Sequence, residues 1–586
     1  MAPRSLVVLI IQALAASAAA AKRLRAPNDK PNVIMLFVDD LGYGDVGFNG
    51  HPTTQTPNID SMAWNGKILT TWYSACPVCT CSRASLMTGR QWPRFGILPV
   101  ISPTTDTGLA LNETTIADEL KKAGYATAIA GKWHLGQREA YLPAARGFDS
   151  YLGIPYSDDM GEARASPCDH PGGARGTSGF SKRPGGSRSA VLDAMGPYVE
   201  AGLTPPPSAA EKNDPAGDFL PLVSQRKDPA TGKVATEVLE QPVDLTRLAP
   251  KYEKFATDFI RDHADEPFFL YLPFSHVHTT ADNQPEKQYC DCEHKNATRR
   301  GAFGDALAET DTIIGRVRAA LEAHGLEGNT LILFTGDNGP WMVQGSSGGS
   351  TGLLSGRFAG YWNVGKGSTW EGGIREAGFA YWPGTIKPFT RSSEIVSSMD
   401  VFPTVLKLAG LPLPTDRAYD GRDFTRVLLE DAGKSEHEVL FFYGGAAGRT
   451  LPSAARYGPF KAHWATGPGL SGCEPSPAAP AGCPVVTYPG GPLVFNVEVD
   501  PSEAYPLTYN TTSPPDPALR AVVAKFVAAY EEEIRNVQRH VSPPAPLGPG
   551  EGPGRYGVCC NRTLGCDCDG PPSSSHDLES LRAAIN

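Results

Sequence analysis

Two pairs of oxygen-bearing side chains stand where apolar runs of the sequence end: Asp39 with Asp40 after the run at 33–38, and Asp337 with Asn338 after the run at 331–334. Carboxylate and amide oxygens are the ligands that Ca²⁺ and Mg²⁺ prefer in proteins. A single pair of this kind is more often a turn or a helix N-cap. Two pairs at two strand ends, together with a cysteine at position 79, favour a site for one divalent cation.

Basic side chains supply groups that can hold an anion or move a proton. Lys132 and His134 follow an apolar run, and an extended backbone there sends both side chains to the same side. Lysine holds anionic oxygens as a point charge, and histidine exchanges protons near neutral pH. In isolation, a surface lysine beside a core histidine is the simpler explanation of this pair. Lys366 lies between two glycines that allow close approach to an anion, although their spacing is not that of a P-loop.

The segment at 76–90 places three cysteines close together. Cys79 stands four residues before Arg83, and helix-like residues follow at once. The plain alternative to a reactive Cys79 is a buried or disulfide-bonded cysteine in a secreted loop. His276 and His278 follow a fourth apolar run. Ionisable side chains of several kinds therefore stand after four separate apolar runs.

Several of these segments resemble those of sulfatases that carry formylglycine, most closely the arylsulfatase A type. The resemblance extends from about residue 31 to 425, more weakly through the C-terminal region, and is carried by the segments at 39–45 (DDLGYGD), 79–90, 131–136 (GKWHLG), 153–157 (GIPYS), 336–340 (GDNGP) and 365–376 (GKGSTWEGGIRE). It implies that a formylglycine-generating enzyme oxidises Cys79 to an aldehyde during synthesis. The aldehyde hydrate carries two hydroxyls on one carbon, of which one attacks sulfur and the other later expels the bound sulfate.

The resemblance also implies roles for individual residues. The metal, Ca²⁺ with Mg²⁺ as the alternative, is implied to bind Asp39, Asp40, Cys79, Asp337 and Asn338. The implied catalytic residues are Cys79, Arg83, Lys132, His134, His278 and Lys366. The implied substrate contacts are Lys132, Ser157, His278 and Lys366. His278 would protonate the leaving group, but the usual following proline is absent and His276 competes for the role.

One position departs from the family pattern. Cys81 stands where these sulfatases have proline or, less often, alanine. Proline restricts the backbone to the extended shape that the modifying enzyme must bind. Cys81 lacks that restriction, and Cys76 is near enough to form a disulfide with it. We therefore expect Cys79 to be converted incompletely.

The elements that must position these residues alternate along the chain. Apolar runs without alternation predict buried parallel strands, at 33–38, 126–130, 268–272 and 331–334. Helical patterns at 115–123 and 303–323 lie between strands and predict an open α/β sheet. Ligands bind at the carboxyl ends of the strands in such sheets. The family resemblance implies, more specifically, an alkaline-phosphatase-like, mostly parallel sheet flanked by helices.

The length of 586 residues predicts more than one domain. We expect a signal peptide at 1–21, a catalytic domain at 22–415 with a partly irregular insertion at 164–241, and a C-terminal domain at 416–586. Strands at 439–443, 460–464 and 493–497 and a helix from Pro517 predict a small antiparallel sheet with a packed helix in the C-terminal domain. The cysteines at 559, 560, 566 and 568 predict a disulfide-stapled tail, with a zinc site as the alternative.

Composition indicates the compartment and the partners. The formal charge of −10, without a basic stripe, argues against a nucleic-acid partner. The N-terminal apolar stretch is short for a stable membrane anchor and suits a secretory signal. Twelve cysteines and four glycosylation sequons, at Asn112, Asn296, Asn510 and Asn561, also suit the secretory route, with a lysosomal or extracellular destination. The expected partner is a sulfate-ester substrate, and the sequence leaves a homo-oligomer open.

Two rival functions stay open. A phosphodiesterase of the same superfamily would use a serine or threonine nucleophile and two metals, which Cys79 and the single set of metal ligands disfavour. A catalytically silent paralogue that binds sulfated glycans would keep the fold without the aldehyde.

Overall fold

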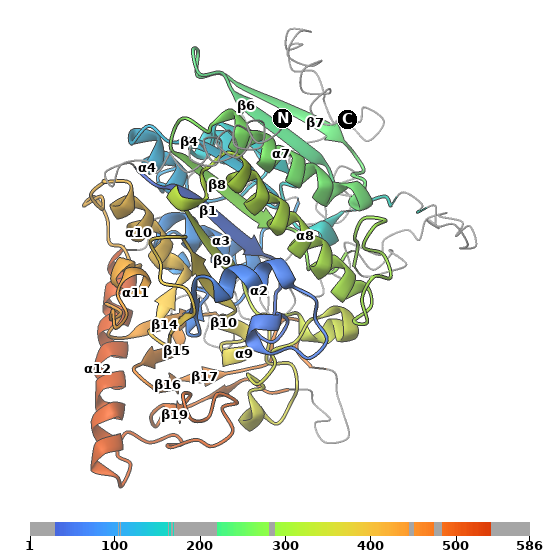
Figure 1. Ribbon diagram of the computed structural model, residues 1–586. Helices are drawn as coiled ribbons and strands as arrows, with labels where there is room; N and C mark the ends of the chain where they lie inside the picture. Colours follow the sequence, from blue (N-terminus) through green and yellow to red (C-terminus); the bar gives the residue numbers. More distant parts are fainter. Residues whose placement is uncertain are drawn as a thin grey trace, which may run out of the picture.

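The computed structural model describes residues 30–103, 105, 107–161, 163–165, 168, 219–280, 288–444, 451–473 and 483–540. Its main sheet has ten strands in the order β12-β2-β11-β9-β1-β8-β4-β5-β6-β7 (Figure 1). The central strands are parallel: β9 (Thr330–Gly336), β1 (Asn32–Val38), β8 (Phe268–Phe274), β4 (Ala126–Ala130) and β5 (Ser150–Gly153). All residues of β1, β4, β8 and β9 are buried, because helices cover both faces of the sheet. The four strands predicted from apolar runs are confirmed.

The outer strands of the sheet are β11 (Gly378–Tyr381), β2 (Lys67–Leu69) and β12 (Thr390–Ser392) at one edge, and β6 (Leu222–Lys227) and β7 (Val234–Glu240) at the other. Strand β6 pairs antiparallel with both β5 and β7. The end of the segment expected to be partly irregular is therefore a regular hairpin. Its turn is stabilised by Asp228, whose side chain accepts hydrogen bonds from the backbone of Ala230 and Thr231. Residues 169–218 lie outside the described part.

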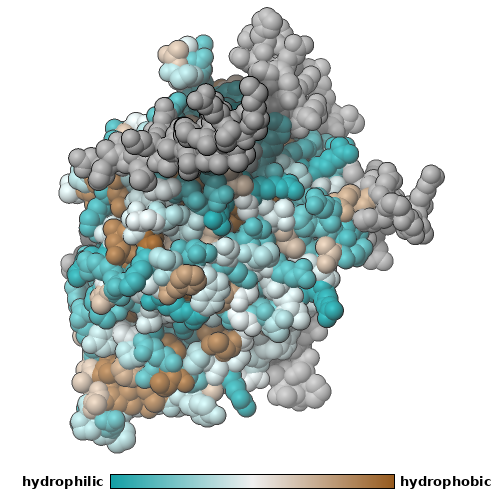
Figure 2. Space-filling view, viewed as in Figure 1, coloured by the Kyte–Doolittle hydropathy of each residue, from teal (hydrophilic) through white to brown (hydrophobic). Residues whose placement is uncertain are grey.

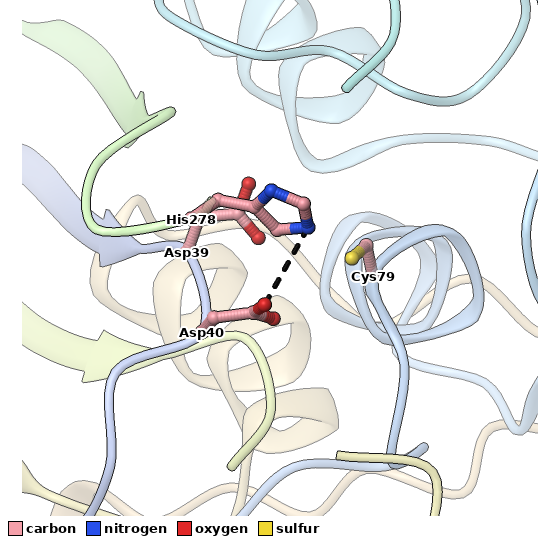
Figure 3. Close-up of side chains that lie close together, drawn as sticks. All are labelled: Asp39, Asp40, Cys79 and His278. Atoms are coloured by element: carbon pink, nitrogen blue, oxygen red, sulfur yellow. Dashed lines mark ion pairs between the residues drawn. The ribbon is translucent and has the colours of Figure 1, made fainter. Parts of the chain in front are cut away.

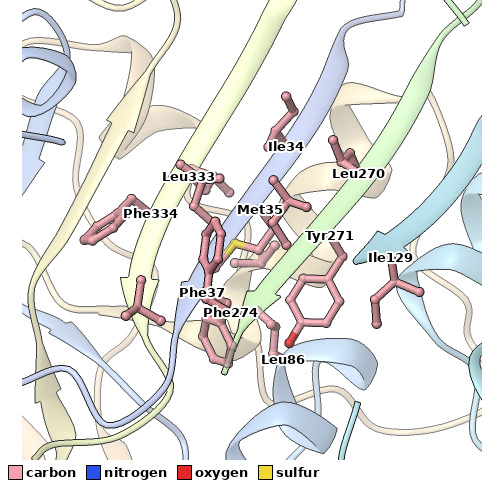
Figure 4. Close-up of a cluster of buried hydrophobic side chains, with 14 of the residues drawn as sticks. Ile34, Met35, Phe37, Leu86, Ile129, Leu270, Tyr271, Phe274, Leu333 and Phe334 are labelled. Carbon is pink, nitrogen blue, oxygen red and sulfur yellow. The ribbon is translucent and has the colours of Figure 1, made fainter. Parts of the chain in front are cut away.

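Helices cover the sheet in two groups: α2 (Pro57–Trp64), α7 (Leu248–Asp262) and α8 (Ala302–Ala323) in front of it in Figure 1, and α3 (Cys79–Thr88), α4 (Ile116–Lys122) and α10 (Val401–Leu408) behind it. Figure 4 shows the core on the α3 side, where Leu86 of that helix lies against side chains of the central strands. The predicted α/β class is confirmed. Thr115 caps α4 and forms a capping box with Asp118.

A smaller antiparallel sheet follows in the chain: β14 (Leu440–Tyr443), β15 (Pro452–Tyr457), β16 (Phe460–His463) and β19 (Leu493–Asn496). Helix α12 (Pro517–His540) packs on it through Val523 and Phe526. The predicted small sheet with a packed helix is confirmed, and β15 is an additional strand. A disulfide joins Cys473 to Cys483. The four cysteines predicted to staple the tail lie outside the described residues.

The remaining short elements connect these layers: β3 (Trp72–Tyr73), β10 (Arg375–Glu376) and β13 (Val396–Ser397) as one small sheet, β17 (Ala465–Thr466) with β18 (Val486–Thr487), and the helices α9 (Glu371–Ile374) and α11 (Thr425–Leu429). On the face seen in Figure 2, hydrophilic residues predominate and hydrophobic ones form scattered groups. Among the described residues, no helix combines the length and apolarity needed to cross a bilayer.

Candidate active site

The predicted metal ligands converge where β1 and β9 end. Their registers align Val38 with Gly336, so the residues that follow the two strands meet. Asn338 donates from Nδ2 to Asp40 Oδ1 at 2.7 Å, and the backbone N–H of Asp40 donates to Asp337 Oδ1 at 3.0 Å. These side chains are buried in the described structure. The convergence expected from the two strand ends is thus present.

Two cations hold the carboxylates of this group. The Arg83 guanidinium donates to Asp337 Oδ2 at 2.8 Å and lies 3.3 Å from Asp39 Oδ1. Lys132 Nζ lies 2.5 Å from Asp39 Oδ2. Burial opposes ionisation of Asp39, but Lys132 and Arg83 hold its pKa well below the ordinary value. Burial and the neighbouring Asp39 raise the pKa of Asp337 to about 7 despite Arg83.

Cys79 is the first residue of α3 and is 2% exposed. Its sulfur and single ligand atoms of Asp39, Asp40 and His278 all lie within 4.8 Å of one another (Figure 3). Burial raises the pKa of the Cys79 thiol to about 12, although Lys132 and Lys366 oppose the rise. Cys79 is not disulfide-bonded, whereas Cys76 and Cys81 are joined to each other. The disulfide considered from the sequence is present.

Lys366 and His278 also contact Asp40. Lys366 Nζ lies 2.8 Å from Asp40 Oδ1 and 2.9 Å from His278 Nε2. Burial and the nearby Lys366 hold the pKa of His278 well below its ordinary value. His276 points elsewhere, with Nε2 2.9 Å from Glu309 Oε2. Of the two competing histidines, His278 is the one beside Cys79.

Ser157 and His134 complete the predicted set. Lys132 donates from Nζ to Ser157 Oγ at 3.0 Å. His134 has a positive φ of 59°, so the extended backbone assumed for residues 132–134 was wrong. Its Nε2 lies 2.8 Å from Ile101 O, while Nδ1 is buried without a hydrogen-bond partner among the described residues. Burial and Lys132 hold the pKa of His134 well below its ordinary value.

Three nearby residues were missed from the sequence. Asp158 Oδ1 lies 3.0 Å from His278 Nδ1, and Asp159 shares this acidic group. Burial raises the pKa of both carboxyls. The Trp341 ring lies 5.0 Å from Lys366 Nζ. The Asp158-Asp159 pair follows Ser157 directly and resembles the Asp39-Asp40 pair after β1. That likeness could have marked it as part of the site from the sequence. No sequence pattern marked Trp341.

The donor set suits a hard divalent cation. Asn338 Oδ1 is buried and has no hydrogen-bond partner among the described residues, and Asp39 Oδ1, which also has none, has only its ion pair with Arg83 at 3.3 Å. Orphaned buried oxygens are costly unless a cation or water satisfies them. Asp40 adds a further carboxylate, and burial raises its pKa, which a cation would reverse. The residues present therefore fit an ion of the Ca²⁺ or Mg²⁺ type.

Three of the four predicted glycosylation sites lie at the surface of the described structure. Asn112, Asn296 and Asn510 are exposed, while Asn561 lies outside the described residues. The Asn510 side chain accepts a hydrogen bond from the backbone of Gly490.

Comparisons with known proteins agree over almost the whole chain. The sequence model of the sulfatase family matches residues 31–411, and that of the C-terminal region of aryl-sulfatase matches 435–568. Arylsulfatase A of Bos taurus is 36% identical, over 96% of this chain and 97% of its own. Steryl-sulfatase of Rattus norvegicus is 36% identical, over 86% and 90%. The crystal structure of the PsFucS1 sulfatase from Pseudoalteromonas sp. superposes with a TM-score of 0.67 at 27% identity, covering 94% and 97%.

Proposed function

Because the chain belongs to the sulfatase family and is a sulfuric ester hydrolase, we propose that it hydrolyses sulfate esters through a formylglycine at position 79. Its activity is of the arylsulfatase A type. The aldehyde hydrate supplies one hydroxyl to attack sulfur and a second to expel sulfate from the covalent ester.

The burial of Cys79 among charged groups carries this proposal. A thiol with a pKa of about 12 is protonated at physiological pH, and the thiolate is the reactive form of cysteine. An unmodified Cys79 is therefore a poor nucleophile in this site. An aldehyde hydrate needs no ionised sulfur and can use the surrounding cations directly. The environment supports chemistry by the modified residue.

We assign the cation to Asp39, Asp40, Asp337, Asn338 and residue 79, with Ca²⁺ preferred because every side chain other than residue 79 offers oxygen. A bound divalent ion would polarise a sulfate oxygen and neutralise developing negative charge.

Basic residues bind the sulfate group and hold the carboxylates in position. Lys132 and Lys366 hold sulfate oxygens, and Ser157 stands beside Lys132 on the substrate side. Arg83 keeps Asp39 and Asp337 in place.

The two histidines move the protons. His278 donates a proton from Nε2 to the departing alcohol, because a sulfate anion beside Lys366 favours the protonated imidazole. His134 accepts a proton when sulfate is expelled, through the ring nitrogen Nδ1, which has no hydrogen-bond partner in the described part of the chain.

The deciding experiment combines peptide mass spectrometry of residue 79 with turnover of an aryl sulfate. We expect an aldehyde at position 79 and no turnover by Cys79→Ala in a folded protein. Cys290→Ala, outside this site, should keep full activity. Full activity of Cys79→Ala would overturn the proposal. An unmodified, inactive wild type would favour the silent glycan-binding paralogue, and faster hydrolysis of phosphate diesters would favour the phosphodiesterase.

We also propose that the chain follows the secretory route to a lysosomal or extracellular site. The support is the N-terminal signal-like pattern, the exposed Asn112, Asn296 and Asn510, and the disulfides.

A further inference from the structure

Asp158 is a buried carboxylate to which the proposed reaction gives no role. It begins the short helix Asp158–Met160 after β5, and 1% of its surface is exposed. Neither of its carboxylate oxygens has a hydrogen-bond partner among the described residues. Lys132 attracts its charge, while three other carboxylates of the site repel it: Asp39, Asp40 and Asp159. A buried carboxylate in such surroundings costs stability, so the fold alone gives no reason for it.

The imidazole of His278 lies directly beside this carboxylate. Asp158 Oδ1 is 3.0 Å from His278 Nδ1, which makes the two side chains an ion pair whenever both are charged. The same nitrogen lies 2.8 Å from the backbone carbonyl oxygen of Thr279. Because a carbonyl oxygen can only accept a hydrogen bond, Nδ1 carries a hydrogen. A carbonyl oxygen and a carboxylate oxygen thus both face the Nδ1–H group of one imidazole.

These contacts determine which ring nitrogen meets the substrate. With Nδ1–H directed at Thr279 and Asp158, the other nitrogen, Nε2, lies 2.9 Å from Lys366 Nζ and 3.4 Å from Asp40 Oδ2 (Figure 3). Lys366 holds sulfate oxygens in the proposed reaction, so Nε2 is the nitrogen on the side of the ester. In a histidine, the hydrogen bond made by one ring nitrogen sets the state and the direction of the other.

We propose that Asp158 is a positioning residue for general-acid catalysis by His278. Its carboxylate and the carbonyl of Thr279 hold the imidazole so that Nε2 faces the departing alcohol. As the bond between sulfur and the alcohol oxygen breaks, the proton on Nε2 passes to that oxygen, while Nδ1–H stays on the ring. Asp158 does not touch the ester and acts through His278. This inference rests on the general-acid role that the proposed function gives to His278.

The first measurement is the dependence of turnover on the leaving group. Asp158→Asn keeps the size of the side chain and removes its charge. The ratio of kcat on activated aryl sulfates to kcat on alkyl sulfates should rise at least about tenfold over the wild type, because only poor leaving groups need the proton. His278→Ala should raise this ratio further, and adding Asp158→Asn to His278→Ala should change it little. An unchanged ratio in Asp158→Asn would overturn the proposal.

The matched control for the first measurement is Asp159→Asn. Asp159 lies one residue further along the same short helix and is also nearly buried, at 8% exposed. Because Asp158 is the residue that pairs with His278 Nδ1, Asp159→Asn should keep the ratio of the wild type. A rise of the same size in both variants would show that the effect comes from loss of negative charge near the site and would overturn the specific role of Asp158.

The second measurement is the melting temperature, which needs no turnover. Asp158→Asn should melt no lower than the wild type, because it removes a poorly compensated buried charge. In His278→Ala, where the carboxylate has lost its partner, the same substitution should raise the melting temperature by more. A lower melting temperature of Asp158→Asn, or equal effects in both backgrounds, would contradict the proposal. An inactive wild type would refute the proposed function, yet this measurement would still decide whether Asp158 and His278 are coupled.

Discussion

Lys132 and Lys366 both act electrostatically on Cys79, and ligand atoms of Asp39, Asp40 and His278 lie within 4.8 Å of its sulfur. The charges of these residues are mutually neutralised in the described structure: Lys132 pairs with Asp39, and Lys366 with Asp40. A sulfate ester and a divalent cation carry the complementary charges that would separate these pairs. The proposed chemistry thus depends on a few ion pairs of 2.5 to 3.4 Å. Each can be tested by substituting one of its two residues.

The first prediction concerns the cation. Asp337→Ala should leave a folded protein with less bound Ca²⁺ and nearly no activity, because Asp337 supplies one of the converging oxygens. Calcium per chain, measured after desalting, checks it. Asp311→Ala removes a carboxylate of α8 that bonds to Asn58 and Ile59 and to none of the proposed ligands, and should keep the calcium. Unchanged calcium in Asp337→Ala would remove this residue from the metal site.

The second prediction separates the two histidines. His278→Ala should slow esters of weakly acidic alcohols far more than activated aryl sulfates, because only poor leaving groups need the proton. A loss of about 100-fold or more on the poor leaving groups is expected. His276→Gln, two residues earlier but directed at Glu309, should show no dependence on the leaving group. Equal losses on both ester classes in His278→Ala would exclude its role as general acid.

The third prediction concerns conversion of Cys79 and rests on the proposed mechanism. The disulfide holds the Cα atoms of Cys76 and Cys81 5.8 Å apart, whereas five extended steps span about 17 Å. The modifying enzyme needs an extended segment, so conversion must precede closure of the disulfide. Cys81→Pro should raise the aldehyde fraction and the specific activity together. An unchanged fraction by peptide mass spectrometry, in Cys81→Pro and Cys76→Ala alike, would refute this.

At the scale of elements, α9 joins the two sheets. Glu371 begins α9, and its carboxylate lies 2.9 Å from Lys461 Nζ of β16. Lys461 also lies 3.3 Å from Glu503, which in turn lies 2.7 Å from His463. All four side chains are fully buried. Because the same segment carries Lys366 a few residues earlier, this network also supports one wall of the candidate active site.

The fourth prediction follows from that network. Lys461→Met should destabilise the protein by about 3–5 kcal/mol, because the buried carboxylates of Glu371 and Glu503 lose the cation that they share, and Arg375 remains beside Glu371 alone. The matched control is Lys434→Met. The Lys434 side chain is 72% exposed, and its partner Glu394 is only partly buried. This control should cost at most about 1 kcal/mol. Denaturant midpoints of the three proteins provide the measurement, and equal midpoints for both variants would contradict the prediction.

At the scale of the whole molecule, stability against acid depends on how the C-terminal sheet is held. Burial opposes ionisation of Glu371, but Lys461 and Arg375 lower its pKa from 4.5 to about 2. A carboxyl with a depressed pKa stabilises the folded state fully above its unfolded pKa. That contribution is lost as the pH falls from about 4.5 towards 2. Burial raises the pKa of Asp311 to about 6, which acts in the opposite sense.

The fifth prediction isolates the contribution of Glu371. The melting temperature of the wild type minus that of Glu371→Gln should be constant above pH 5 and should shrink between pH 4.5 and pH 3. Taking the difference removes the effect of Asp311, which both proteins share. A difference that does not change with pH would show that Glu371 does not titrate in this window.

The sequence by itself determined which residues stand at the strand ends, because buried parallel strands are continuous apolar runs whose limits are visible. The family motifs likewise marked Cys79, Arg83, Lys132 and Lys366 as candidate site residues. Only the tertiary structure showed which of His276 and His278 lies beside Cys79, since the loop after β8 directs His276 to Glu309 and His278 to Asp40. It also decided the contact of Asp158 with His278, and the left-handed backbone at His134. These depend on packing between segments more than 100 residues apart in the chain or on single backbone angles, and neither leaves a periodic pattern in the sequence.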